Sequence, residues 1–321
     1  MKIRLLYVAI LLSFGFSSYA QTSKDKWWET LHNWDGITPW QNYMQLSAKY
    51  MGPNGMPVPE INKGNLPEYS YLELGGAVHN SPGDHTENGF FNTMFKAGSR
   101  AAFNVYLVPY EQYDMDTLTS RHTRNTRDYN GSGHSVGDVY LTAYFQVLKE
   151  KIVQPDVLLT FGIRTASGSN LEGARFTDTP GYYYGISTGK TIKFKSAFFK
   201  SIRPYLLGGA YTWQTYQVSC KQDNAPWYGG GITLNTSYFV FDDNLSGYKG
   251  FMQNGDQPVV NRVSVTSAFN SFINVRVLFQ QGLHDYDYKS FMMSTILNMD
   301  RIKKSVFKKH YTARDNKKAT V

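Results

Sequence analysis

Apolar and polar side chains alternate along most of the chain after residue 68. In the run 136–150, VGDVYLTAYFQVLKE, apolar residues hold the odd positions from 139 to 147, and polar residues or tyrosines hold the even positions from 138 to 146. Successive side chains of a β-strand point to opposite faces, so a period of two predicts strands. Twelve segments carry this pattern: 69–78, 89–98, 100–112, 136–150, 156–165, 181–193, 201–216, 230–240, 244–253, 259–268, 271–281 and 286–299.

The strand count depends on one ambiguous stretch. The odd positions carry the outward-facing pattern without a change of parity from Val263 to Phe279, so residues 259–280 could form one long strand in place of a hairpin. That alternative gives about eleven strands, whereas single-chain bacterial barrels normally have an even number. The pattern therefore predicts about twelve strands, within a range of about 10–14.

Alternation alone does not separate a soluble sandwich, whose apolar face is inside, from a membrane barrel, whose apolar face meets lipid. The N-terminus indicates export. Lys2 and Arg4 precede an apolar run at 5–16, and Ser18-Tyr19-Ala20 has the small-x-small form of a cleavage site, so residues 1–20 are predicted to be a cleaved signal peptide. No later apolar run is long enough for a membrane-spanning helix.

The predicted connections differ in length from one side of the sheet to the other. Short connections are expected at 98–100, 150–154 and 242–244, and long ones at 79–88, 112–135, 167–180, 217–225 and 281–286. Outer-membrane barrels have short periplasmic turns and long external loops, whereas a sandwich has no reason for this difference. We therefore expect an all-β fold, a transmembrane antiparallel β-barrel over residues 69–299, in the bacterial outer membrane. Aromatic residues at 182–184, 211–213 and 227–228 are expected to form its interfacial girdle.

Net charge changes this picture little. The formal net charge is +8, but Lys2 and Arg4 lie in the predicted signal, and residues 301–321 hold eight Lys or Arg and one Asp. The body of the chain is therefore close to neutral, which argues against a nucleic-acid-binding domain. Residues 300–321 are predicted to be a basic periplasmic tail. The single cysteine, Cys220, excludes an intrachain disulfide.

Residues 21–68 have no strand pattern, and the glycines and prolines between 52 and 67 exclude a long regular element. Four of the six tryptophans lie here: Trp27, Trp28, Trp34 and Trp40. We expect a periplasmic extension that packs on or into the barrel through these residues, which makes them plug candidates. The alternative is a loose arm with interfacial tryptophans.

The alternation predicts which side chains line the lumen and set its electrostatics. They are Glu73, Arg100, Asn104, Tyr106, Asp138, Tyr140, Tyr144, Arg164 and Arg276. Rows of arginine and carboxylate could select solutes in an open pore. Alternatively, the same charges could pair across a narrow lumen and block it.

One long loop carries a cluster of cationic and titratable residues, Arg121, His122, Arg124 and Arg127. It could meet anionic sugars or lipid phosphates, or it could be a solvated loop beside the anionic outer leaflet. The loop 167–181 could fold inward as a constriction or cap the strands.

Catalytic and metal sites are weakly indicated. Outer-membrane hydrolases need a serine beside a histidine base. The candidates are His79 with Ser81, His85, and His134 with Ser132 or Ser135, but all are predicted to lie on loops. His79, Asp84 and His85 lack a familiar ligand spacing, so no metal and no cofactor is expected.

The segments GDVYLTAYFQVL, PDVLLTFGIRTASGSN and DTPGYYYGISTGKTI resemble the outer-membrane barrel proteins related to the phenol-degradation (MetA-pathway) family. This chain has Thr165-Ala166-Ser167-Gly168 where a proline is expected before the Thr/Ser-Gly pair. The Trp-rich segment with YMGPNGMPVPE resembles a feature of an uncharacterised subgroup of barrels. The resemblance implies a barrel that passes hydrophobic or aromatic small molecules, and it carries over no catalytic residue.

Together these features predict an outer-membrane channel or facilitator for small, hydrophobic or aromatic solutes. Its expected partners are outer-membrane lipid, a small-molecule solute and the barrel-assembly machinery, and not nucleic acid. A non-conducting structural or interaction barrel with an envelope protein partner is the second hypothesis. An outer-membrane lipid-modifying hydrolase is the third.

Overall fold

The computed structural model describes residues 25–269 and 272–302. The predicted signal peptide and most of the basic tail lie outside these residues. The chain divides between Tyr43 and Met44 into two compact units. In the first, the short helix α2 (Lys26–Leu31) is followed by a 3₁₀ turn, η2 (Trp40–Tyr43). No helix among the described residues is long and apolar enough to cross a membrane.

The second unit is built almost entirely from strands. Its elements are β1 (Tyr71–Ser81), β2 (Asp84–Ala97), β3 (Ala101–Met115), η3 (Leu118–Thr123), β4 (Ser132–Ser135), β5 (Tyr140–Leu148), β6 (Asp156–Arg164), η4 (Leu171–Gly173), β7 (Gly181–Gly189), β8 (Ile192–Lys193), β9 (Phe199–Gln214), β10 (Gln222–Thr236), β11 (Phe239–Tyr248), β12 (Val259–Ser267), β13 (Ile273–His284) and β14 (Lys289–Asn298).

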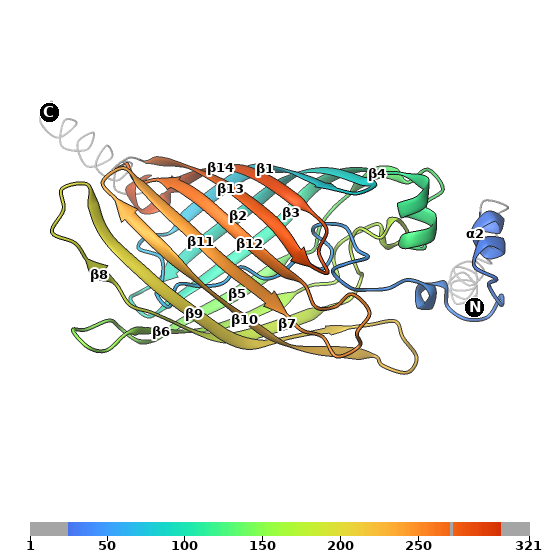
Figure 1. The fold of residues 1–321 in the computed structure, drawn as a ribbon, viewed down its shortest axis with the longest axis horizontal. Helices are drawn as coiled ribbons and strands as arrows, with labels where there is room; N and C mark the ends of the chain where they lie inside the picture. Colours follow the sequence, from blue (N-terminus) through green and yellow to red (C-terminus); the bar gives the residue numbers. More distant parts are fainter. Residues whose placement is uncertain (1–24, 270–271, 303–321) are drawn as a thin grey trace, which may run out of the picture. The chain divides into compact units, whose positions relative to one another are not determined.

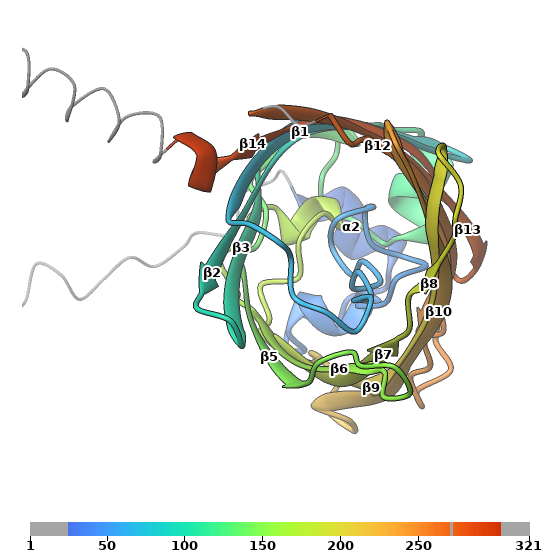
Figure 2. The same cartoon turned by 90° about the vertical axis from the view of Figure 1, so that its left-hand side faces the viewer.

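Twelve of these strands form one closed antiparallel ring. Neighbours in the ring follow chain order, and the ring closes where β1 pairs with β14, from Tyr71 opposite Asn298 to Asn80 opposite Lys289. The short strands β4 and β8 pair with β3 and β9 outside this ring. Figures 1 and 2 show the tilted strands and the closed ring. The predicted fold, an antiparallel barrel of about twelve strands, is confirmed.

The ambiguous stretch 259–280 is a hairpin and not one strand. β12 pairs with β13, with Val265 opposite Val277 and Thr266 opposite Arg276. From Val260 to Thr266, each residue of β12 faces a residue of β13 with the same parity, because the two residue numbers add up to 542. Both strands therefore present their odd positions to the same face, so an unbroken parity does not distinguish a long strand from a hairpin.

The apolar face of the ring points outward. In β7, buried and exposed positions alternate almost perfectly, with Tyr182, Tyr184 and Ile186 exposed and Tyr183 and Ser187 buried. The inner positions of the ring are rich in Thr, Ser, Asn and Arg, and the outer positions in Leu, Ile, Val and Phe. This is the arrangement of a barrel that meets lipid on its outside.

A bulge interrupts the alternation in β3. Gly89 of β2 pairs with Tyr110, but Phe91 pairs with Leu107, so β3 has one extra residue at this point. Pro109 lies in the bulge, where its missing N–H costs no ladder hydrogen bond. After the bulge the faces exchange, so Tyr110 points outward and not toward the lumen as the parity predicts.

The connections define two ends of the barrel. One, here called the long-loop end, carries the connections 116–139, 165–180, 215–221, 249–258 and 285–288, and the turn 82–83. The other, the short-turn end, carries 98–100, 149–155, 190–198, 237–238 and 268–272. Two predictions were wrong. The long loop at 79–88 is only the turn Pro82–Gly83, and residues 242–244 lie inside β11, because the turn falls at 237–238.

The predicted aromatic girdle is only partly formed. Tyr182, Tyr184 and Tyr228 are exposed on the outside, but several of the other residues point inward and are buried. Tyr183, Tyr211, Trp213 and Trp227 form an internal cluster with Tyr248, with ring centroids 5.0 to 6.2 Å apart. Consecutive aromatic residues in a strand necessarily point to opposite faces.

We predict that Ile186→Arg destabilises the barrel by about 2–4 kcal/mol, because Ile186 lies near the middle of β7 on the outer face, where a charge enters hydrocarbon. Ile186→Leu keeps the apolar surface and is the control. Urea unfolding in lipid vesicles measures both. Equal stability of the two variants would contradict an outer face in contact with lipid.

Candidate functional site: the lumen segment and its cavity

Residues 44–68, here called the lumen segment, run through the inside of the ring before β1 begins. Figure 2 shows this light-blue chain within the circle of strands. The segment begins at the long-loop end, where the Ser47 hydroxyl donates to the Asn254 carbonyl and the Lys49 amide donates to the Gly255 carbonyl. Lys49 also lies 3.8 Å from the Asp285 carboxylate.

Wall side chains hold the backbone of the segment farther inside. The Arg164 guanidinium donates to the Gly55 carbonyl at 2.7 Å, and the Arg262 guanidinium donates to the Val58 carbonyl at 2.6 Å. Tyrosine hydroxyls do the same for other carbonyls: Tyr286 donates to Pro53 and Tyr248 donates to Met56, both at 3.1 Å.

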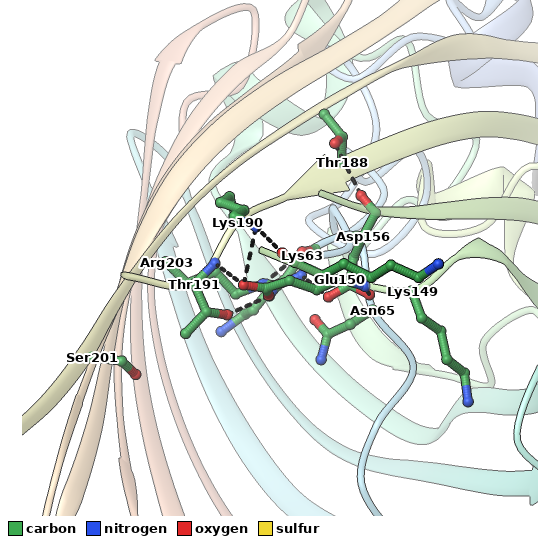
Figure 3. A network of polar contacts seen from close by, with 12 residues as sticks. Lys63, Asn65, Lys149, Glu150, Asp156, Thr188, Lys190, Thr191, Ser201 and Arg203 are labelled. Carbon is green, nitrogen blue, oxygen red and sulfur yellow. Dashed lines mark hydrogen bonds and ion pairs between the residues drawn. The ribbon is translucent and has the colours of Figure 1, made fainter. Parts of the chain in front are cut away.

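The segment leaves the lumen at the short-turn end through a polar network (Figure 3). Arg203 donates to the Lys63 carbonyl and also binds Glu150 and Asp156 at 3.1 and 2.9 Å. The Lys63 ammonium group lies 2.7 Å from the Asp242 carboxylate. Farther along, Gln146 donates to the Gly64 carbonyl and accepts from the Leu66 amide.

Glu150 lies in the turn 149–155 at the edge of this network. Partial burial disfavours its charge, but hydrogen bonds from Thr191 and the charges of Arg203 and Lys190 outweigh that effect and lower the pKa of its carboxyl. A lowered pKa stabilises the folded state above the ordinary glutamate pKa, and this contribution is lost as the pH falls through the lowered value. The network at the short-turn end is therefore built to persist at neutral pH.

The loop 165–180 contacts the segment at the long-loop end. Arg175, fully buried, binds Asp84 at 2.9 Å and Glu111 at 2.8 Å. Its guanidinium lies against Gly52, where even a Cβ atom would come within 2.5 Å of the arginine. The Gly52 amide donates to the Ala174 carbonyl. Of the two alternatives for the loop 167–181, the structure shows the inward fold.

A cavity of about 210 Å³ lies between the lumen segment and the wall. Six tyrosines line it together with Phe90, Phe176, Met94, Met292 and the proline-rich part of the segment. Its charged lining groups are Glu60, Glu73 and Asp138 against Arg262 and Arg276, so the net charge is small. The Glu60 side chain is 64% exposed although it lies inside the ring, so the adjoining space is large enough to hold water.

Seven of the predicted lumen residues border this cavity: Glu73, Asn104, Tyr106, Asp138, Tyr140, Tyr144 and Arg276. The polar ones are linked in a chain. Asn104 donates to Asn92, Asn92 donates to Glu73, and Arg276 lies 3.7 Å from Glu73 and 3.0 Å from Glu60. Opposite charges are thus paired beside the open space.

Two predicted lumen residues have other positions. Arg164 is fully buried and contacts the lumen segment, the Thr179 carbonyl and, at 4.0 Å, Asp138, but it does not border the cavity. Arg100 is exposed in the turn before β3, and its guanidinium donates to the carbonyls of Gln146 and Val147. The assignment of Arg100 to the lumen was wrong, because strand alternation does not extend into a turn.

The cationic loop is not simply solvated. Arg124 is buried and donates to Asp84 and Tyr288 at 2.6 and 2.7 Å. Arg121 lies over the Tyr129 ring at 4.6 Å, and Arg127 lies 3.7 Å from Glu172. His122 is exposed in η3. The side chains of this loop therefore hold it together, and Arg124 anchors it to the barrel.

The four tryptophans predicted as plug residues belong to the first unit, and the segment that fills the lumen lies after them. Trp28 packs against His32 and Tyr43 of the same unit, with ring centroids 4.8 and 5.5 Å apart. Two wall anchors, Arg203 and Arg262, were not among the predicted lumen residues, although both are buried at inward-facing positions of their strands.

A serine and a histidine do meet, but not in a predicted pair. His79 is buried, with Nδ1 2.7 Å from the Ser290 hydroxyl and Nε2 2.8 Å from the Asn88 side-chain oxygen. Ser290 is 1% exposed and does not border the cavity, whereas His79 does. His79 faces the lumen and His85 is exposed to solvent, and no group of three metal-ligating residues occurs in the described part of the chain.

The fold has known counterparts. The chain matches no family model and no curated protein sequence. Among solved structures, it is similar to the COG4313 outer membrane channel from Pseudomonas putida F1, at 10% identity and a TM-score of 0.51, over 75% of this chain and 99% of that one. Weaker matches are the KdgM porin (9% identity, TM-score 0.43) and the NanC porin (11%, 0.44), each over 70% of this chain and 98% of the other. The first of these similarities establishes a shared fold.

We predict that Arg164→Met destabilises the protein by about 3–5 kcal/mol, because it leaves the buried Asp138 carboxylate without its only arginine neighbour among the described residues and releases the Gly55 carbonyl. Urea unfolding is the measurement. The double variant Arg164→Met/Asp138→Asn should recover part of the lost stability, because it removes the unpaired carboxylate.

Arg262→Met is the matched control, since Arg262 also binds a segment carbonyl but leaves no carboxylate partner behind within 4.0 Å. It should cost less than Arg164→Met. An equal cost would show that the Asp138 pairing contributes nothing.

Proposed function

We propose that the protein is an outer-membrane channel for small solutes, and that the described structure is its closed state. The apolar outer face and the difference between the two ends support insertion in the outer membrane. The observation that carries the proposal is the cavity beside Glu60. It lies inside the ring, borders wall and segment alike, and would extend into a path if the segment shifted.

The cavity also suggests the class of solute. A protein cavity of about 150 Å³ holds one benzene molecule, so this larger one has room for a single substituted ring. Six tyrosines and several apolar side chains offer aromatic contacts, and the small net charge offers little attraction to ions. We infer that the preferred solutes are small, uncharged and partly aromatic.

The first test is single-channel conductance of the folded protein in a planar bilayer. The full chain should be silent, because the lumen segment and its covering loops leave no continuous path. Deletion of residues 25–66 should produce discrete conductance steps. Deletion of residues 25–43 alone is the control, since it keeps every anchor of the lumen segment, and it should stay silent.

The second test addresses the solute. Benzyl alcohol should raise the melting temperature of the full chain, because a ligand that binds only the folded state stabilises it, and glucose should not. Ile61→Trp fills the cavity from the lumen segment without removing a side-chain hydrogen bond, so it should abolish the shift. If benzyl alcohol still raised the melting temperature of Ile61→Trp, it would bind outside this cavity.

A second candidate function is a non-conducting interaction barrel. It is favoured by the hydrogen bonds that hold the lumen segment from Ser47 to Leu66, since a permanent filling of the lumen needs such anchors along its length. Silence of the 25–66 deletion, in protein shown to be folded, would support this candidate and contradict the channel.

A further inference from the structure

The lumen segment has a direction, and its contacts follow chain order along the barrel. Ser47 and Lys49 contact the loop 249–258 at the long-loop end. Val58 and Asn62 contact β12 and β6 in the interior. Gly64 and Leu66 bind Gln146 of β5 near the short-turn end, and the Lys96 ammonium group reaches the Glu68 carbonyl there.

The chain therefore crosses the entire barrel before its first strand begins. β1 starts at Tyr71 at the short-turn end and runs back toward the long loops. Because Met44 begins the segment at the opposite end, the residues before it leave the barrel there. An N-terminal extension on the same side as the short turns, which the sequence analysis expects, does not fit this direction.

We propose that the barrel threads its own N-terminus through the lumen and presents residues 25–43 on the outer surface of the cell. The sidedness follows from the long loops, which face outward in outer-membrane barrels. The proposal concerns display of a segment and not conduction, so it does not rest on the channel function.

The point of exit is held firmly. Besides the Ser47 and Lys49 contacts, the Tyr50 and Met51 amides both donate to the Ser47 carbonyl, which forms a tight turn. Met44, Leu46 and Met51 are at most 5% exposed. The chain thus emerges at a packed position among the loops and not through a loose gap.

The presented residues have local structure of their own. Asp35 accepts hydrogen bonds from the amides of Ile37 and Thr38, and the Trp34 indole donates to the Thr38 carbonyl at 2.7 Å. Between α2 and η2 this turn leaves Ile37 88% exposed. A large apolar side chain at such a position is available to reagents and to partners.

Cysteine labelling of whole bacterial cells tests the proposal. Each variant is the full chain with Cys220→Ser and one new cysteine, and a membrane-impermeant maleimide is added before or after lysis. Ile37→Cys reports on the presented residues, Val218→Cys on the long-loop end and Ile152→Cys on the short-turn end. The three positions are 88%, 78% and 97% exposed, so accessibility in the folded protein is matched.

Ile37→Cys and Val218→Cys should label equally in intact and lysed cells, and Ile152→Cys should label only after lysis. Heat-modifiable migration on gels confirms that each variant is folded. Labelling of Ile37→Cys only after lysis, with Val218→Cys labelled in intact cells, would overturn the threading. Labelling of Ile152→Cys in intact cells would overturn the assignment of the long-loop end to the cell surface.

Discussion

A backbone without regular structure must find hydrogen-bond partners when it is enclosed inside a barrel. Irregular chain at membrane depth is tolerated only where protein or water satisfies its polar groups. In this barrel the wall supplies them: Arg164, Arg203, Arg262, Gln146 and two tyrosine hydroxyls bind six carbonyls of the lumen segment between Pro53 and Gly64. Many polar side chains on the inner face of the strands are therefore occupied by hydrogen bonds to the lumen segment. Only the polar groups that are not bound in this way can contact a solute.

This division explains the character of the remaining space. Arg164, Arg203 and Arg262 bind backbone carbonyls of the segment, and the cavity is lined mainly by tyrosines, apolar side chains and the linked row from Asn104 to Arg276. A barrel of the same width without the segment would have a charged, water-filled lumen. With it, the lumen resembles a small-molecule pocket.

The sequence predicts the barrel well because each strand alternates between residues that face outward and residues that face the lumen, and this pattern is visible in the sequence. It predicts the interior poorly for a different reason. The lumen segment has no periodic pattern of apolar residues. Its close contacts depend on glycines such as Gly52, where a side chain would collide with Arg175. Arg124 and Arg175 look like solvated loop residues in a sequence, since their carboxylate partners Asp84 and Glu111 come from distant strands. The bulge in β3 turns the Tyr110 side chain to the outer face, and a strict alternation of positions does not predict such a change.

The order of threading also has a mechanical consequence. The lumen segment is joined to β1 at the short-turn end, so the lumen can be emptied only if the whole N-terminus is drawn back through it. At the long-loop end the segment is held by the contacts of Ser47 and Lys49 with the loop 249–258, and the ring closed by β1 and β14 prevents a sideways escape. An open path through the lumen therefore requires the lumen segment to move between its two fixed ends.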